Sequence, residues 1–430
     1  MNDISVTLLE GREDPRKKGS NSIEQRAYAL GLGIRGRTAI RQVDEGLWQT
    51  VKERGFESQR FQLHIAGLVI PLRSEKDNAD ETSEPSLIIY QSELCAGLTN
   101  ELERRHGTSG RLRMKHGTRV TRCDLNDMKI TTENGEVVTE ERYDLILGCD
   151  GVNSVVRAAM QDSFPAFQST KEKLPGEFKV VRLDKVPPGV DPTSVSLILP
   201  KKGSVGAFVE PTGKDGSCCI LFSGRGETPI LRETKNATAV VEVLAAAFPQ
   251  WEGFHKGIAN ELMRQSTTGT ASSVVCNIYN FGDKAALAGD ACHATGGVSG
   301  QGVNSALADS VVLAKCILEN QNDLAAGLLE YSCRQVPEGR ALYDLSFGPK
   351  PKGIQGFVWA ARSARDTLFR GRFGIGRPPL QTRLTTDLTA FLDIRREIDK
   401  YYDDPFPSNS ELRRTLTSIH ETALKATVAK

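Results

Sequence analysis

The stretch ALAGDACHATGGVSGQGVNSALADS, residues 286–310, combines three features that together could hold a ligand. An apolar strand ends at Asp290, a glycine-rich loop follows, and a helix begins near Gln301. Glycines let a backbone approach a ligand closely, and the first turn of a helix offers unpaired N–H groups that favour negative charge. The carboxylate can accept hydrogen bonds from hydroxyl groups. The combination suits a flavin, with its ribityl chain on Asp290 and its pyrimidine edge over the helix start.

The full pattern favours this interpretation, whereas a bare Gly-Asp pair would favour a purely structural strand–loop–helix turn. His293, in the same loop, is expected to be a hydrogen-bond partner rather than a base. We predict cofactor contacts from six residues of the stretch: Gly289, Asp290, Gly300, Gln301, Gly302 and Asn304.

A second candidate site lies in YDLILGCDGVNSVVR, residues 143–157, where an apolar run ends at Asp150 and Gly151 before a helix. Ser154 can cap that helix. Asp150 can reach a cofactor or orient Arg157, although the same residues could instead form a helix cap with a salt bridge. Because both motifs occur in one chain, we predict that Asp150 and Gly151 also bind the cofactor.

The strands around these motifs follow an α/β pattern. The apolar runs 143–149 and 284–290 are typical of buried parallel strands. Asn134-Gly135 between two alternating runs predicts a hairpin. From about 165 to 270, short strands spaced about ten residues apart predict a separate antiparallel sheet.

Two predicted helices flank the candidate residues. Residues 38–54 are expected to form one helix that Gly55 ends. The helix after the glycine-rich loop is expected to bury an apolar side made of Val303, Ala306, Leu307, Val311, Ala314 and Leu318.

The composition excludes several classes of function. The 430 residues leave room for two or three domains, and a net charge of +1 gives no electrostatic reason to expect a nucleic acid or a membrane as partner. Nine cysteines match no zinc or disulfide pattern, so we expect reduced thiols and no metal. Without a signal peptide or a run of about 18 apolar residues, the chain is expected to be soluble, intracellular and cytoplasmic.

Both motifs resemble those of the single-component FAD-dependent aromatic monooxygenases, which share the para-hydroxybenzoate hydroxylase-like fold. EGREDPRKKG, SIEQRAYALGLGIRGRTAI and KDGSCCILF are similar to the kynurenine monooxygenase subgroup. The resemblance implies an α/β fold, in which a Rossmann-like FAD-binding parallel sheet of the glutathione reductase type carries an inserted antiparallel-sheet substrate domain and a helical C-terminal region. The implied divisions are a discontinuous FAD-binding domain at 1–60, 86–165 and 270–335, a substrate domain at 61–85 and 166–269, and the C-terminal region at 336–430.

The resemblance also implies an activity and further site residues. NADPH or NADH would reduce FAD, and O2 would form a flavin C4a-hydroperoxide that hydroxylates a small aromatic molecule. Glu10 would bind the adenosine ribose, and Arg26 and Arg35 would line the FAD site. The kynurenine subgroup holds its substrate carboxylate with an Arg and a Tyr. By the resemblance the Arg would be Arg60 or Arg73, and the Tyr position falls on Leu72.

Three departures from the family leave alternatives open. The chain begins at what resembles a second strand, without a first strand and its GxGxxG loop. Gln91 and Gly297 stand where the family commonly has Arg and Pro. GLGIRG, residues 31–36, fits GxGxxG by letter, but SIEQRAYA before it is too polar for the required strand. The alternatives are a flavin-free or inactive truncated relative, and a flavin oxidoreductase of the same fold that does not hydroxylate.

Overall fold

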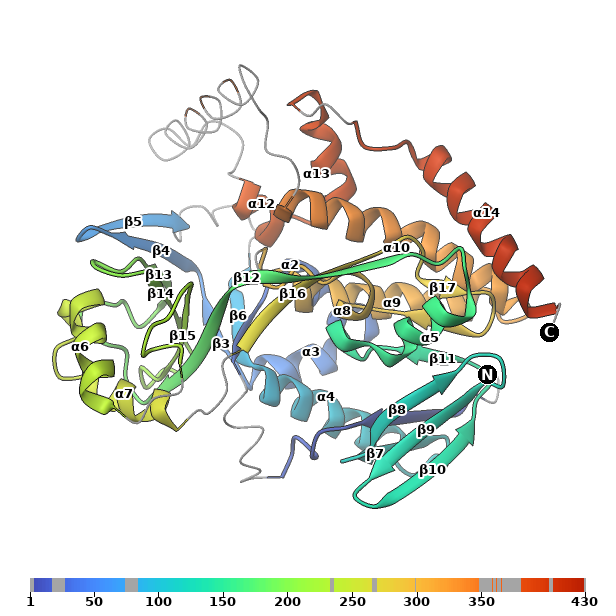
Figure 1. Cartoon of the computed structure of the whole chain (residues 1–430), viewed down its shortest axis with the longest axis horizontal. Coiled ribbons are helices and arrows are strands. Elements are labelled where there is room, and N and C mark those ends of the chain that lie inside the picture. Colours follow the sequence, from blue (N-terminus) through green and yellow to red (C-terminus); the bar gives the residue numbers. More distant parts are fainter. Residues whose placement is uncertain are drawn as a thin grey trace. The chain divides into compact units, whose positions relative to one another are not determined.

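The computed structural model describes residues 4–17, 28–73, 84–232, 236–264, 269–297, 299–347, 358, 361, 365, 380–401 and 405–428. Close contacts group the chain into two compact units, whose elements are labelled in Figure 1. Unit 1 comprises 1–33, 44–117 and 173–271, and unit 2 comprises 34–43, 118–172 and 272–430. This grouping by contact does not test the division by function implied by the resemblance, which stays a prediction.

Unit 1 contains a seven-stranded sheet of the order β16-β12-β15-β14-β13-β4-β5. Its strands are mostly antiparallel, with β13 and β4 running parallel. Their bounds are β4 Arg60–Ile65, β5 Leu68–Arg73, β12 Ser169–Leu183, β13 Ser194–Ile198, β14 Val205–Pro211, β15 Cys218–Gly224 and β16 Gly269–Cys276. The borders between the two units fall within β12 and β16.

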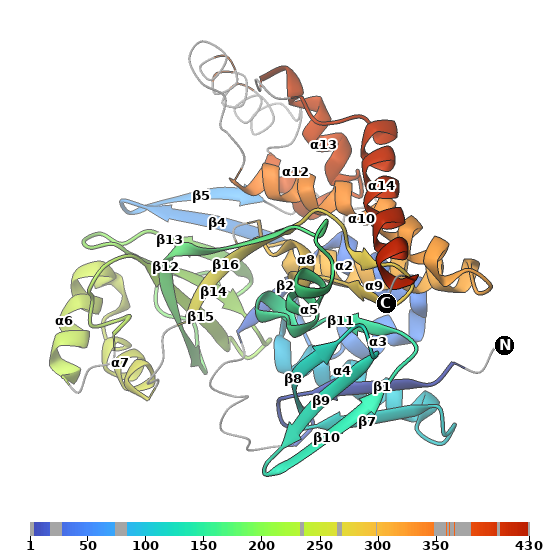
Figure 2. The ribbon, with the colours of Figure 1, turned by 45° about the vertical axis from the view of Figure 1, so that its right-hand side comes forward.

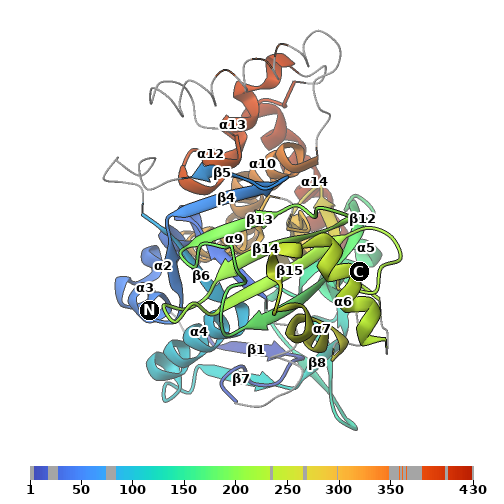
Figure 3. The same ribbon diagram turned by 90° about the vertical axis from the view of Figure 1, so that its left-hand side faces the viewer.

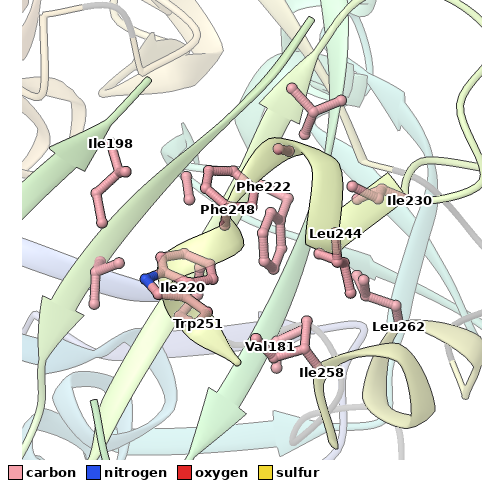
Figure 4. Close-up of a cluster of buried hydrophobic side chains, with 14 of the residues drawn as sticks. Val181, Ile198, Ile220, Phe222, Ile230, Leu244, Phe248, Trp251, Ile258 and Leu262 are labelled. Atoms are coloured by element: carbon pink, nitrogen blue, oxygen red, sulfur yellow. The ribbon is translucent and has the colours of Figure 1, made fainter. Parts of the chain in front are cut away.

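Two helices, α6 (Ala237–Ala247) and α7 (His255–Met263), cover one face of this sheet (Figure 3). Alternate residues of β14 point into this layer, and the buried side chains of Phe222, Phe248 and Trp251 fill it (Figure 4). Phe248 and Trp251 stack with their ring centroids 4.4 Å apart. Burying each such side chain contributes roughly 1.5–3 kcal/mol to folding. We call this the helix-covered face, and the opposite side is the second face of the sheet.

Among its described residues, unit 1 also contains two small sheets and two further α-helices. β1 pairs in parallel with β7, and β6 lies between β2 and β3 in an antiparallel sheet. These elements are β1 Val6–Glu10, β2 Ala29–Leu32, α3 Glu45–Lys52, β3 Phe56–Ser58, β6 Ser86–Tyr90, α4 Gln91–His106 and β7 Leu112–His116.

Unit 2 contains two three-stranded sheets and several helices. In one sheet β18 lies between β11, to which it is parallel, and β17. The other, β10-β9-β8, is antiparallel and is clearest in Figure 2. The strands are β8 Arg119–Asp124, β9 Lys129–Asn134, β10 Val137–Arg142, β11 Ile146–Gly148, β17 Asn280–Phe281 and β18 Ala285–Leu287. The α-helices are α2 Ile34–Val43, α5 Val155–Ser163, α8 Asp290–His293, α9 Gly302–Glu319, α10 Leu324–Phe347, α12 Leu380–Thr386, α13 Phe391–Glu397 and α14 Asn409–Val428.

The predicted α/β class is confirmed, as are several of its elements. β9 and β10 form the hairpin predicted at Asn134-Gly135, β13 to β15 form the predicted antiparallel strands, and β11 and β18 pair in parallel. The single helix predicted over 38–54 is wrong, because α2 ends at Val43 and α3 begins at Glu45. Asp44 separates them by capping α3, where its carboxylate accepts a hydrogen bond from the Leu47 N–H at 2.9 Å.

The predicted apolar side of α9 is also wrong. Leu318 is 54% exposed, whereas Asn304, Ser305 and Asp309 are buried. This helix turns polar side chains inward at its N-terminal half, where the glycine-rich loop meets it. No helix within the described ranges is both long enough and apolar enough to cross a membrane.

Candidate functional site

The glycine-rich loop of unit 2 presents open backbone at the start of α9. Gly289, Gly297 and Gly300 have φ of 62°, 81° and 67°, and a Cβ at Gly297 or Gly300 would meet nothing within 4 Å. The N-cap residue of α9, Gln301, makes no side-chain capping bond. The loop therefore leaves room for a ligand and presents it with the positive end of an 18-residue helix.

Asp290 lies beside this helix start, because a Cβ on Gly302 would be 3.7 Å from its Oδ1 atom. Desolvation by the surrounding fold raises the pKa of Asp290. The residue nevertheless remains exposed to solvent. The predicted ribityl-binding residue is thus an accessible acceptor next to the helix N-terminus.

Asp309, in the middle of α9, holds the start of the glycine-rich motif in place, a role that was not predicted from the sequence. Its Oδ2 atom accepts a hydrogen bond from the Gly289 N–H at 2.9 Å and lies 2.5 Å from Nε2 of His293. Burial opposes protonation of His293, but the charge and hydrogen bond of Asp309 outweigh it and raise the histidine's pKa. The available signal for the role of Asp309 was an acidic residue within an otherwise apolar helical segment. His293 is a partner within the loop, as predicted.

Cys292 lies near this pair, and one ligand atom from each of the three residues falls within 4.8 Å of the others. The histidine and the aspartate already bond to each other, and the cysteine Sγ donates to the Gly289 carbonyl at 3.3 Å. These contacts tie the loop together, and the absence of a metal stays a prediction.

Gln301 and Asn304, both predicted to touch the cofactor, are buried at the loop–helix junction. Asn304 donates from Nδ2 to the Gly300 carbonyl at 3.3 Å. A Cβ at Gly36 of α2 would lie 2.5 Å from the Asn304 Oδ1 atom, so the two helices touch at this point. Asn304 therefore links the loop to α2.

The second motif is arranged around the start of α5. Ser154 caps the helix as predicted, accepting from the Arg157 N–H at 2.9 Å. Asp150 accepts from the Val155 N–H at 2.7 Å instead of orienting Arg157. Gly151 follows with a φ of 74°.

Arg157 connects the two motifs. Its guanidinium donates to the Val152 carbonyl and to the Ala291 carbonyl, both at 2.7 Å, and the residue is 7% exposed. A buried cation that donates to a carbonyl in each motif fixes the distance between the two segments. Arg157 therefore links the turn at Asp150 and Gly151 to the start of the glycine-rich motif at α8.

The N-terminal candidates are divided between unit 1, unit 2 and the residues outside the described ranges. Glu10 ends β1, and its Oε1 accepts from the Arg12 N–H at 2.8 Å. Arg26 falls outside the described residues. The GLGIRG run begins inside a short strand, β2, which was not expected from the sequence, and β2 pairs antiparallel with β6, unlike the parallel strand that precedes a phosphate loop. Arg35 lies in unit 2 and stacks on Phe391 at 4.0 Å.

The two predicted substrate residues are on β4 and β5 at the edge of the large sheet. Arg60 forms an ion pair with Asp191 at 3.1 Å. Leu72 is 41% exposed, at a bulge in the pairing of β5 with β4. The neighbouring Arg73 donates to the Gln59 and Ser58 carbonyls. Both nearby arginines therefore have partners within the protein.

An apolar groove of about 570 Å³ lies instead on the second face of the sheet. Phe208 and Leu221, directly opposite each other on β14 and β15, lie in its wall beside Leu197. We call this the apolar groove, and its lining comprises Leu197, Leu199, Pro200, Gly203, Ser204, Gly206, Ala207, Phe208, Leu221 and Ser223. Its walls suit an aromatic ring.

A row of polar side chains crosses three strands next to the groove. Cys219 lies opposite both Arg182 on β12 and Glu210 on β14. The Arg182 guanidinium is 4.2 Å from the centroid of the Tyr90 ring. Burial raises the pKa of Tyr90 to about 12 and that of Glu210 to about 8. The sequence analysis did not single out Glu210, although an acid among alternating apolar residues in VGAFVEP was a signal.

Comparisons with known proteins agree with this picture. The profile of the FAD binding domain family matches residues 24–346, well over half of the chain. Kynurenine 3-monooxygenase of Salinispora arenicola (strain CNS-205) is 26% identical over 346 residues, covering 79% of this chain and 73% of that protein. The Sus scrofa enzyme of the same name is 25% identical over 357 residues, covering 80% and 70%.

Solved structures show the same fold. The tetrameric form of 2-methyl-3-hydroxypyridine-5-carboxylic acid oxygenase superposes with a TM-score of 0.62 at 18% identity, covering 89% of both chains. Tetracycline destructase Tet(55) gives a TM-score of 0.55 at 15% identity, covering 88% of this chain and 99% of its own. The chain therefore belongs to the FAD binding domain family and, with these relatives, to the FAD-dependent monooxygenases, which are oxidoreductases.

Proposed function

We propose that this protein is a kynurenine 3-monooxygenase-like enzyme that uses FAD, O2 and NADPH or NADH to hydroxylate a small aromatic molecule. The observation that carries the proposal is the open glycine loop at the uncapped start of α9, with the accessible carboxylate of Asp290 beside it. Relatives named kynurenine 3-monooxygenase support the reaction class.

The residues present fit a flavin. Gly297 and Gly300 have free space where a side chain would stand, so the cofactor could lie close to their backbone. Asp290 would accept from the ribityl hydroxyls. Gly289, Gln301, Gly302 and Asn304 would shape the turn, while Asp150 and Gly151 would approach the cofactor from the second motif. In unit 1, Glu10 would accept from the adenosine ribose.

When bound, FAD reduced by the nicotinamide would activate O2 and pass one oxygen atom to the aromatic ring. The start of α9 would stabilise negative charge on the cofactor, since its first N–H groups point along a helix dipole. Arg157 and Asp309 would keep the loop in this geometry without touching the reacting atoms. The apolar groove would hold the ring and exclude water from it.

The substrate would contact the second face of the sheet instead of Arg60 and Leu72. Asp191 already neutralises Arg60 at 3.1 Å, so this arginine would have to break an ion pair to bind a carboxylate. The groove beside Phe208 and Leu221 offers an apolar surface large enough for a single substituted ring.

A visible absorption spectrum and a turnover assay of the purified protein test the proposal. The expected results are a flavin band and consumption of NADPH or NADH that an aromatic substrate stimulates, with a hydroxylated product. A protein that stays colourless with added FAD would be the flavin-free relative. Nicotinamide oxidation without hydroxylated product would identify a flavin oxidoreductase.

Variants of Asp290 test its role directly. D290A should weaken FAD binding about tenfold to a hundredfold, because it removes the charged acceptor of hydroxyl groups. E136Q removes one negative charge from the exposed hairpin tip and is the matched control. Equal FAD affinity of D290A and the parent protein in a fluorescence titration would refute this assignment.

A further inference from the structure

We propose that Glu210 is a specificity residue that selects an aromatic substrate bearing a protonated amine. The inference rests on the proposed function, because it names the substrate class of the same groove. It follows from three observations: the position of Glu210 next to the groove, its burial, and the absence of an internal partner for its charge among the described residues.

The strand register places Glu210 one row of residues beyond the wall of the groove. Side chains two residues apart on a strand share a face, so Glu210 lies on the same face as Phe208. Its cross-strand partner is Cys219, just as Leu221 is the partner of Phe208. The pair Glu210–Cys219 is therefore the next row beyond the groove wall, and a ring resting on Phe208 and Leu221 would direct a substituent toward it.

Glu210 is buried, with 5% of its surface exposed. Burial alone shifts its pKa, so no charge or hydrogen bond of the described residues stabilises its ionised form. Arg182 is two strands away, about 10 Å at the usual strand spacing, and stacks on Tyr90 at 4.2 Å. Burying an ionised carboxylate without a partner destabilises the folded protein. A ligand that places a cation beside the carboxylate would offset this loss of stability.

The chemistry of the ligand follows from this arrangement. An ammonium group would form an ion pair with the Glu210 carboxylate in a low-dielectric site. Because the positive charge favours the ionised carboxylate, Glu210 would release its proton when the ligand binds. A carboxylate at the same place would meet a like charge or an already protonated acid, so it would be disfavoured. The groove should therefore rank ring substituents in the order ammonium, neutral hydroxyl, carboxylate.

Three probes with the same ring test this order on the FAD-loaded full chain: 4-hydroxybenzylamine, 4-hydroxybenzyl alcohol and 4-hydroxybenzoate. Calorimetric titration at pH 7 should show at least tenfold tighter binding of the amine than of the alcohol. Repeating the amine titration in buffers of different ionisation enthalpy should show release of most of one proton, which a merely structural glutamate would not give.

E210Q keeps the size of the side chain and removes its charge. It should lose most of the preference for the amine and all of the proton release, while binding the alcohol as before. E136Q, the same change on the exposed hairpin tip, should keep both. Equal amine affinity of E210Q and the parent protein, or amine binding without proton release in the parent protein, would overturn the inference.

Failure of the inference is distinguishable from failure of the proposed function. If all three probes bind alike and the protein holds FAD, the groove stands and only the role of Glu210 is refuted. If none of the probes binds, the groove is not the substrate site and the inference falls with it. If FAD does not bind, the proposed enzyme activity itself is refuted.

Discussion

At the scale of single residues, the site depends on buried polar groups whose partners differ greatly in number. Arg157 serves two carbonyls, and Asp309 serves one backbone N–H and one histidine. Glu210 is buried without such support. A group of the first kind stabilises the fold and positions a loop, whereas a group of the second kind destabilises the fold and is available to a ligand.

Glu210 should make the unfolding free energy depend on pH. Its pKa is about 8 in the folded chain, against an ordinary value of 4.5. The folded state therefore holds the proton more tightly, and stability should fall as pH rises from about 4.5 to 8, by at most about 5 kcal/mol. Cys219 and Tyr90 stay neutral in this range because burial raises their pKa values.

E210Q should flatten this slope and be more stable than the parent protein at pH 8. Urea unfolding followed by circular dichroism at pH 5, 6.5 and 8 measures it. E136Q should keep the parental slope. A slope that E210Q leaves unchanged would show that another group is responsible.

Replacing Arg157 should loosen the link between the two motifs. R157M leaves the Val152 and Ala291 carbonyls without their donor, so we expect a loss of about 2–4 kcal/mol in unfolding free energy and weaker FAD binding. R157K keeps the cation but not the forked geometry of the guanidinium, so its unfolding free energy should lie between those of R157M and the parent protein. An R157M protein with parental stability would show that water replaces the guanidinium at both carbonyls.

At the scale of elements, the site is built where helices begin. α5 starts at the second motif with Ser154 and Asp150 as acceptors for its first N–H groups, while α9 starts at the glycine-rich loop with no side-chain cap. One helix start is therefore closed by the protein, and the other is left for a ligand.

Removing the cap of α5 gives a test at this scale. S154A should lower the unfolding free energy by about 1 kcal/mol, since the Arg157 N–H loses its acceptor in a buried position. S154G should cost only a few tenths of a kcal/mol, because glycine is tolerated at this position of a helix. Thermal unfolding of the two variants side by side measures the difference, and a larger loss for S154G would contradict the capping role.

At the scale of the whole molecule, cofactor binding should stabilise the fold. The proposed contacts include Asp150, Asp290 and the glycine-rich loop of unit 2. A ligand that binds only the folded state adds about 2.7 kcal/mol at a hundred times its dissociation constant. We expect added FAD to raise the midpoint of thermal unfolding by several degrees.

Differential scanning fluorimetry with increasing FAD measures this shift, with D290A as the comparison. The variant should need more FAD for the same increase. A midpoint that FAD leaves unchanged in the parent protein would contradict cofactor binding by the whole chain.

Local signals predicted much of this molecule. Asn134-Gly135 predicted a hairpin because this pair favours the tight two-residue turn that connects antiparallel strands. The apolar run before Gly148 and the one ending at Leu287 indicated parallel strands, and the two strands do pair in parallel. The second strand is buried on both faces, whereas Leu147 in the first is 45% exposed. The loop between Gly289 and Gly302 could be predicted because a cluster of glycines is unfavourable within a regular helix or strand.

The rest depended on contacts between distant parts of the chain. The hydrogen bond from Arg157 to the Ala291 carbonyl joins residues 134 positions apart, and no periodicity in the sequence predicts it. The buried face of α9 was misassigned because Asn304, Ser305 and Asp309 are polar, and a pattern of apolar residues locates a core but not a polar site. Glu210 was passed over because a strand pattern records which face a residue shares, not whether its charge has a partner.

The contact between Gly36 and Asn304 has a consequence for how this protein can vary. A Cβ at position 36 would lie 2.5 Å from Asn304 Oδ1, so a larger residue would displace the asparagine that bonds to Gly300 in the loop. A saturation library selected for FAD retention should recover only glycine there. At Gly257 in α7, where an added Cβ meets nothing within 4 Å, the same library should accept alanine and gain stability. The packing of the loop against α2 thus restricts the residue at a helix position that is not itself among the proposed cofactor contacts.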